Sequence, residues 1–297
     1  MGGERGFSST PAQGVARRAE SAHKGFVVHC DSSCPIGIFD SGVGGLTVAR
    51  AVMDRLPSES IVYFGDTARV PYGVKSPDTV ARYAGQITNF LLAKNVKLLI
   101  VACNTMAAVA LPAITALSPA PVLEVISAGA ASALAATRTK RIGIIATPST
   151  IASRAYESAL AALGGPEVFT ASKACPLFVP LVEEGWLAHP ATRLVAEEYL
   201  TPLLAENLDT LILGCTHYPL LAPLLAEVAG PDVRLQDSAT AVAERAAAVL
   251  GYLGLAAPKG PDTPRHVFHV TDMPRKFREI GELFLGRPME DVRLEKL

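Results

Sequence analysis

The stretch Leu99–Thr105, LIVACNT, has a close counterpart at Leu211–His217, LILGCTH. In each copy a short apolar run, typical of a buried strand in a parallel sheet, leads directly to a cysteine. Polar residues follow the cysteine in both copies. Cys103 and Cys215 therefore stand at matching positions, at an offset of 112 residues (215 minus 103). Self-similarity of this kind indicates a duplicated structural unit.

A second pair of segments supports the duplication. Ile36–Ser41, IGIFDS, resembles Ile142–Thr147, IGIIAT, at an offset of 106 residues (142 minus 36). Other apolar runs of similar length are each followed by sequence compatible with a helix, an alternation that predicts βαβ units and parallel sheets. The expected strands are Ile36–Phe39, Ile61–Phe64, Leu98–Ala102, Val122–Ile126, Ile142–Ala146, Val168–Ala171, Leu211–Gly214 and Val233–Gln236.

Length and helix signals agree with two α/β units. The chain has 297 residues, of which 49% are hydrophobic and 19% charged, enough for two compact cores. The clearest expected helix has Ser76 as its N-cap and Pro77 in its first turn, and it ends at Asn95. We expect two similar α/β domains with parallel sheets, related by a pseudo-twofold axis, with the functional site between them.

Composition argues for a small-molecule partner. Lys and Arg number 27 and Asp and Glu 28, so the chain lacks the basic excess that binding to nucleic acid or an anionic membrane needs. The first 33 residues contain no apolar run longer than Phe26–Val28 and hence no secretory signal, which predicts a cytoplasmic protein. Five cysteines, an odd number, in that compartment predict that at least some of the thiols are free.

The region 98–136 could be mistaken for a membrane span, because its one charged residue is Glu124. Polar residues and prolines divide it into pieces too short to cross a bilayer: Asn104, Thr105, Pro112, Pro119 and Pro121. A buried α/β core explains the region better.

The two cysteines are the first candidates for chemistry. In each half the cysteine follows a strand and precedes an expected helix, the place where open α/β sheets bind ligands. Backbone N–H groups and the dipole of a helix N-terminus favour the thiolate, so we expect each thiol to be a better base than a free one with a pKa of ~8.5. Alternatively, each cysteine is a small core residue. Matching positions in two repeated halves favour the chemical interpretation.

Two further candidates lie near the cysteines in sequence. Asp40, in the glycine-rich stretch 40–45, is either a helix N-cap or a carboxylate that orients Cys103 or receives its proton. The stretch lacks the glycine spacing of a dinucleotide site. His217 is either a structural histidine or a group that relays or donates a proton beside Cys215. A Cys–His protease dyad would leave the second cysteine unexplained.

The remaining candidates carry weaker signals. Tyr72, in the loop 66–73, is a hydrophobic anchor or part of a pocket wall, and Glu183 is a site residue or a solvated helix residue. Cys175 is expected to be a packing residue. Cys30 and Cys34 lack a second ligand pair at zinc-finger spacing, so no metal site is expected.

From about residue 35 to its C-terminus the chain resembles bacterial glutamate racemase, within the aspartate/glutamate racemase superfamily. The stretches that carry the resemblance are Phe39–Leu46, Gly65–Asp66 with Pro71–Gly73, Ala102–Thr105, Gly214–Pro219 and Phe284–Gly286. Accordingly we expect flavodoxin-like domains. The expected divisions are an N-terminal extension, flexible, at 1–34, a first domain at 35–127 plus 239–297, and a second domain at 128–238.

The resemblance implies roles for individual residues. Cys103 would act on D-glutamate and Cys215 on L-glutamate, without a cofactor, and Glu183 and His217 would assist Cys215. The other residues that the resemblance places in the substrate site are Asp40, Ser41, Pro71, Tyr72, Gly73, Asn104, Thr105, Thr147, Thr150 and Thr216.

The resemblance also implies a cellular role, the supply of D-glutamate for peptidoglycan, by a homodimer or a monomer. The N-terminal extension resembles that of forms regulated by a cell-wall precursor. Three alternatives stay open on the residues alone: racemisation of aspartate or a related acid, a two-lobed binding protein for an anionic amino acid, and a thiol redox protein.

Overall fold

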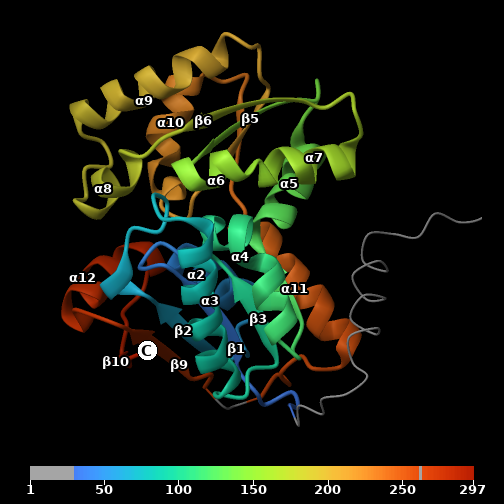
Figure 1. Cartoon of the computed structure of the whole chain (residues 1–297), viewed down its shortest axis with the longest axis vertical. Coiled ribbons are helices and arrows are strands. Elements are labelled where there is room, and N and C mark those ends of the chain that lie inside the picture. The colour runs from blue at the N-terminus through green and yellow to red at the C-terminus, as the bar shows by residue number, and fades with distance from the viewer. Residues whose placement is uncertain (1–29, 261–262) are drawn as a thin grey trace, which may run out of the picture.

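Two parallel sheets form the framework of the protein (Figure 1). The structure is a computed structural model that describes residues 30–260 and 263–297, so the expected flexibility of residues 1–29 lies outside the described residues. In the described part, the larger sheet has six strands in the order β10-β9-β2-β1-β3-β4, and the smaller has four in the order β6-β5-β7-β8. Every pairing between neighbouring strands is parallel.

The strands are β1 (Ile36–Asp40), β2 (Ile61–Gly65), β3 (Leu98–Val101), β4 (Val122–Glu124), β5 (Arg141–Ala146), β6 (Phe169–Ala174), β7 (Thr210–Gly214), β8 (Arg234–Gln236), β9 (His266–Val270) and β10 (Val292–Leu294). The helices are α2 (Leu46–Arg55), η1 (Thr67–Arg69), α3 (Pro77–Leu92), α4 (Asn104–Leu117), α5 (Val125–Ala136), α6 (Pro148–Ser153), α7 (Ala155–Gly164), α8 (Phe178–Glu183), α9 (Pro190–Leu204), η2 (Tyr218–Leu221), α10 (Ala222–Ala229), α11 (Ala239–Leu253) and α12 (Pro274–Leu285).

The two sheets repeat one topology, which confirms the predicted fold class. In the larger sheet the first four strands are ordered β2-β1-β3-β4, and the smaller sheet repeats that order as β6-β5-β7-β8. In each sheet the next two strands along the chain lie on opposite sides of the first: β2 and β3 flank β1, and β6 and β7 flank β5. The order of strand addition therefore reverses between β1 and β3 and between β5 and β7. Such switch points are where doubly wound sheets bind ligands, at the carboxyl ends of the strands.

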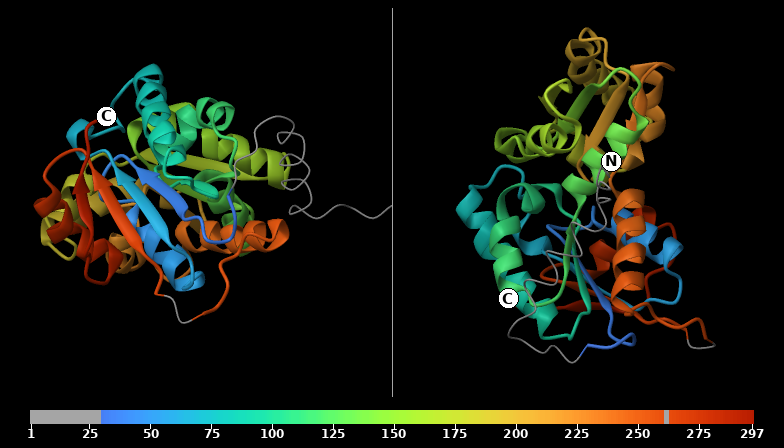
Figure 2. Two further views of the ribbon diagram at one scale, coloured as in Figure 1. Left: turned by 90° about the horizontal axis from the view of Figure 1, so that it is seen from below. Right: turned by 90° about the vertical axis from the view of Figure 1, so that its right-hand side faces the viewer.

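Several elements differ from the sequence prediction; among them, α3 ends at Leu92 rather than at Asn95, and β6 ends at Ala174 rather than at Ala171. The strand expected at Val122–Ile126 ends at Glu124, because the Glu124 carboxylate accepts hydrogen bonds from the N–H groups of Ile126 at 2.5 Å and Ser127 at 2.9 Å and so caps α5. The prediction missed β9 and β10, which extend the larger sheet beyond β2 (Figure 2). The expected N-cap is confirmed, since the side chain of Ser76 accepts a hydrogen bond from the Thr79 N–H.

Two helices connect the halves that the sheets form. The chain enters the smaller-sheet half through α5 and returns through α11, and α11 packs against both α5 and α2 (Figure 1). The proposed domain boundaries at 127–128 and 238–239 stay a prediction.

The apolar region 98–136 folds as β3, α4, β4 and α5, with β3 wholly buried. Among the described residues, none of the helices combines the length and the hydropathy that crossing a bilayer requires.

Candidate active site

A single cavity of about 360 Å³ lies where the carboxyl ends of β1, β3, β5 and β7 meet. Both cysteines line it, Cys103 directly after β3 and Cys215 directly after β7. Each half therefore contributes one thiol to the same space. The other lining residues are Ser41, Gly42, Val70, Pro71, Tyr72, Gly73, Val74, Asn104, Thr105, Thr147, Pro148, Pro176, Val179, Pro180, Glu183, Thr216 and His217.

Two of the residues assigned to the site lie behind the cavity wall rather than in it. Asp40 is 1% exposed and Thr150 is 2% exposed, and neither lines the cavity. All the other assigned residues do. Sequence reasoning missed the apolar part of the wall, formed by Val70, Val74, Pro148, Pro176, Val179 and Pro180. These side chains carry no chemical signal that a sequence pattern could reveal.

Cys103 is the N-cap of α4, as predicted, but its electrostatic environment is the reverse of the expected one. Burial, followed by the nearby Asp40 carboxylate, raises the pKa of the Cys103 thiol to about 12. Hydrogen bonds from Met106 and Ser41 lower the pKa by less than these two effects raise it. The expectation that the helix N-terminus makes this thiol a better base was wrong. At neutral pH, Cys103 is a proton donor.

Asp40 links the turns that carry the two cysteines. Its Oδ1 accepts hydrogen bonds from the Gly42 N–H at 2.9 Å and the Ser41 hydroxyl at 3.5 Å, and Ser41 in turn accepts from the Cys103 thiol at 3.8 Å. Its Oδ2 accepts from the Thr216 hydroxyl at 3.4 Å. The alternative role as a helix N-cap is wrong, because α2 begins after Gly45. Burial raises the pKa of the Asp40 carboxyl.

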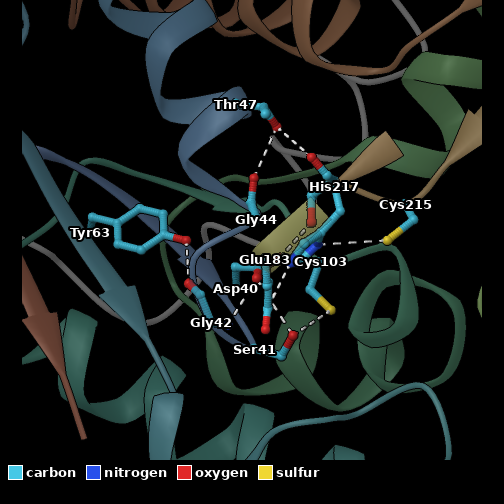
Figure 3. Close-up of polar contacts among 11 residues, drawn as sticks. Asp40, Ser41, Gly42, Gly44, Thr47, Tyr63, Cys103, Glu183, Cys215 and His217 are labelled. Carbon is cyan, nitrogen blue, oxygen red and sulfur yellow. Dashed lines mark hydrogen bonds and ion pairs between the residues drawn. The ribbon is translucent and has the colours of Figure 1, made fainter. Parts of the chain in front are cut away.

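Cys215, His217 and Glu183 form a chain of contacts on the opposite side (Figure 3). The Sγ atom of Cys215 lies 3.9 Å from Nδ1 of His217, whose Nε2 lies 2.9 Å from Oε1 of Glu183. Burial opposes protonation of His217, but the contacts with Cys215 and Glu183 outweigh it and raise the pKa of His217 to about 10. His217 is therefore an imidazolium at neutral pH and places a positive charge beside the Cys215 sulfur.

The helix expected directly after Cys215 is absent, and that prediction was wrong. A short 3₁₀ helix, η2, begins at Tyr218, and α10 begins only at Ala222. The reason is Pro219, which has no N–H to donate to the Cys215 carbonyl. The Tyr218 N–H donates to that carbonyl instead, at 3.1 Å. The imidazolium of His217, rather than a helix dipole, supplies the positive charge next to this thiol.

The raised pKa of His217 predicts a pH-dependent stability. A folded pKa of about 10, above the ordinary 6.5, contributes stability that is fully present below pH 6.5 and is lost as pH rises through 10. The difference in unfolding free energy between the wild type and His217→Gln should therefore be largest at pH 6 and should shrink towards pH 10. Urea denaturation at pH 6, 8 and 10 measures it. An equal difference at all three values would contradict the assigned charge.

Three threonine hydroxyls from the two halves meet beside the cavity, which Thr105 and Thr147 line and Thr150 does not. The Oγ1 atoms of Thr105 and Thr147 lie 3.0 Å apart, and Oγ1 of Thr150 lies 2.9 Å from that of Thr147. Thr105 lies in the first turn of α4 in the larger-sheet half, whereas Thr147 is the N-cap of α6 and Thr150 lies within α6 in the other half. Hydroxyls of this kind can donate to a carboxylate oxygen.

Tyr72 fills both of its predicted roles, since it is buried and also lines the cavity. Its hydroxyl donates to Oδ2 of Asp66, which is fully buried. The adjacent Gly73 is in close contact with the other half, because a Cβ atom there would lie 2.7 Å from Cβ of Thr147. The Gly73 carbonyl also accepts a hydrogen bond from the Ser149 N–H at 2.9 Å. This loop therefore closes one side of the cavity.

The other three cysteines do not line the cavity. Cys175 is fully buried, as expected for a packing residue, and Cys30 and Cys34 are half-buried thiols. In the part of the chain that the structure describes, His, Cys, Asp and Glu side chains form no group of three or more with the arrangement of a metal site.

Known proteins are similar to this chain in both sequence and fold. The chain is 61% identical to the glutamate racemase of Syntrophus aciditrophicus (strain SB) over 258 residues, which cover 87% of this chain and 95% of that protein. Among solved structures, glutamate racemase from Francisella tularensis in complex with D-glutamate superposes with a TM-score of 0.84 at 39% identity, covering 89% of this chain and 98% of that one.

A more distant relative is the Escherichia coli glutamate racemase solved with L-glutamate and the activator UDP-MurNAc-ala. It superposes with a TM-score of 0.72 at 27% identity, covering 87% of this chain and 97% of that one. The Asp/Glu/Hydantoin racemase family matches residues 46–246, which include both cysteine turns. The chain therefore belongs to the Asp/Glu/Hydantoin racemase family.

Proposed function

We propose that this racemase interconverts L- and D-glutamate without a cofactor, with Cys103 and Cys215 acting on opposite faces of the substrate α-carbon. The observation that carries the proposal is the placement of the two thiols. They come from matching strand ends of two repeated halves and line one cavity of about 360 Å³. Two acid–base groups that approach one carbon from opposite sides can invert it.

The charge states of the two sides suit one direction of the reaction. For L-glutamate, the Cys215 thiolate removes the α-proton and the Cys103 thiol donates its proton to the opposite face. The products are D-glutamate, a Cys215 thiol and a Cys103 thiolate, so protons and charge balance. The His217 imidazolium lies against the Cys215 sulfur, where its charge can offset that of the reacting thiolate, and the pKa of Cys103 of about 12 keeps the starting Cys103 thiol protonated. The reverse reaction starts from the opposite pair of states.

The cavity also offers groups that hold the substrate and stabilise the developing negative charge. Backbone N–H groups at the N-terminus of α4 and the hydroxyls of Thr105, Thr147 and Thr216 are available to carboxylate oxygens. The apolar wall formed by Val179 and Pro180 displaces water, which strengthens these interactions.

The proposed cellular role is the supply of D-glutamate for peptidoglycan synthesis, and a cell-wall precursor is the proposed effector. This proposal is supported by the similarity of the chain to the E. coli glutamate racemase, whose structure was solved with the activator UDP-MurNAc-ala.

Incubation of the purified protein with D-glutamate in deuterated water, with no added cofactor, tests the proposal. The expected product is L-glutamate with deuterium at the α-carbon, because the proton that is delivered comes from a thiol in exchange with solvent. Aspartate at the same concentration serves as the comparison substrate, and its turnover should be slower. Deuterium-free glutamate that keeps its configuration would refute the proposal and leave a binding protein as the alternative.

A further inference from the structure

A chain of three buried polar side chains ends at the cavity. The Tyr156 hydroxyl donates to Oδ1 of Asn104 at 2.7 Å, and it lies 3.2 Å from Oγ of Ser238. Tyr156 is 1% exposed and Asn104 is 4% exposed, so these contacts are shielded from bulk water. Tyr156 lies on α7 of the smaller-sheet half, whereas Asn104 is the first residue of α4 and follows Cys103. The chain therefore connects the two halves beside one of the thiols.

The surroundings of Ser238 determine the direction of the hydrogen bonds. Ser238 occupies the N-cap position of α11, yet its hydroxyl makes no capping bond, and the Asp237 carboxylate accepts from the Ala239 N–H instead, at 2.8 Å. The Ser238 hydroxyl is therefore free to donate to Tyr156, which leaves the Tyr156 proton for Asn104. Gly129 makes room for this arrangement, since a Cβ atom there would lie 2.3 Å from Oγ of Ser238.

The direction of the hydrogen bonds from Ser238 through Tyr156 to Asn104 determines which end of the Asn104 amide faces the cavity. Oδ1 is engaged by Tyr156, and burial raises the pKa of the Tyr156 phenol, which keeps it a neutral donor. Among residues 30–260 and 263–297, no hydrogen bond uses Nδ2 of Asn104 as its donor. Asn104 lines the cavity, so its NH₂ group is the end available to a bound molecule. An NH₂ group attracts a carboxylate oxygen, whereas a turned amide would present its own oxygen and repel it.

We propose that Tyr156 is a positioning residue that holds the Asn104 amide with its NH₂ group towards the cavity, where it donates to a carboxylate oxygen of the substrate. The inference rests on the proposed function and adds a residue outside the cavity wall to the machinery of substrate binding. Tyr156 touches no substrate atom and acts through Asn104 alone.

The variant Tyr156→Phe tests this role with little change in side-chain volume. Without the hydroxyl, Oδ1 of Asn104 loses its donor, and the amide regains a partner by turning that oxygen to water in the cavity. The KM for glutamate should rise by about 10-fold, the worth of one hydrogen bond to a charged group, whereas kcat should change by less than about threefold. An unchanged KM would overturn the inference.

A double-mutant cycle separates positioning from a general loss of stability. The dissociation constant of glutamate is measured by calorimetry for the wild type, Tyr156→Phe, Asn104→Ala and the double variant, and interconversion of enantiomers contributes no net heat. If Tyr156 acts through Asn104, the Tyr156 substitution should have no further effect once the amide is absent. An equal weakening in both backgrounds would overturn the inference. A wild type that does not racemise glutamate would instead refute the proposed function, so the two failures are distinguishable.

Discussion

Cys103→Ala and Cys215→Ala are each expected to lower the rate of glutamate racemisation by about 10²–10⁴-fold in both directions, the range for loss of one acid–base group. Both enantiomers are affected because each thiol is the base in one direction and the acid in the other. The loss should appear in kcat. It is measured by the change in optical rotation, or with a coupled assay for one enantiomer.

The cysteine variants should also keep a partial reaction that identifies the face each thiol serves. In deuterated water, Cys103→Ala should exchange the α-proton of L-glutamate slowly with retained configuration, because Cys215 can remove a proton and return a deuteron to the same face. Cys215→Ala should do the same with D-glutamate. The matched control is Cys175→Ala, since Cys175 is fully buried and does not line the cavity. Near-normal racemisation by either site variant would refute the two-thiol mechanism.

Gly44→Ala is expected to have the second largest effect, although Gly44 is outside the cavity wall. A Cβ atom at this position would lie 2.3 Å from Oγ1 of Thr216 and 2.4 Å from Nδ1 of His217. Nδ1 is the atom that faces Cys215. The added methyl group therefore displaces the imidazolium from the Cys215 sulfur, and kcat/KM should fall by about 100-fold, as for a misplaced catalytic group.

The surrounding structure makes this displacement difficult to relieve. The hydroxyl of Thr47 donates both to the Gly44 carbonyl at 3.0 Å and to the Thr216 carbonyl at 3.2 Å, which ties the two segments together (Figure 3). Gly251→Ala, where a new Cβ atom meets nothing within 4 Å, is the matched control and should keep full activity. Wild-type kcat/KM in Gly44→Ala would show that the position of His217 does not matter for turnover.

The fold was predictable where the pattern of apolar residues was repeated. The two copies of the strand–cysteine stretch and the shared segments at β1 and β5 indicated a duplication, and the strand order in the two sheets confirms it. The prediction missed β9 because its sequence, HVFHV, carries two histidines and offers no continuous apolar run. It missed β10 because three residues, two of them exposed, are too short for a periodic signal.

The candidate site was predictable as a set of residues but not in its electrostatics. The carboxyl ends of parallel strands lie at the same edge of a sheet, where ligands bind. Cys103, Cys215 and their polar neighbours follow such strand ends, so they were expected to lie together. The raised pKa of Cys103 depends on burial and on Asp40, which the folded sheet brings near Cys103 from the end of the neighbouring strand β1. The Pro219 signal against a helix after Cys215 was present in the sequence and was overlooked.

The position of deuterium early in turnover tests the opposed-thiol claim most directly. Unlabelled L-glutamate is converted by the wild type in deuterated water, and the substrate and product are separated after a few per cent of reaction. Two thiols on opposite faces predict D-glutamate that carries deuterium at the α-carbon, while the recovered L-glutamate still carries protium. D-glutamate that retains the original proton, or equal labelling of both pools, would show that one group serves both faces and would contradict the account.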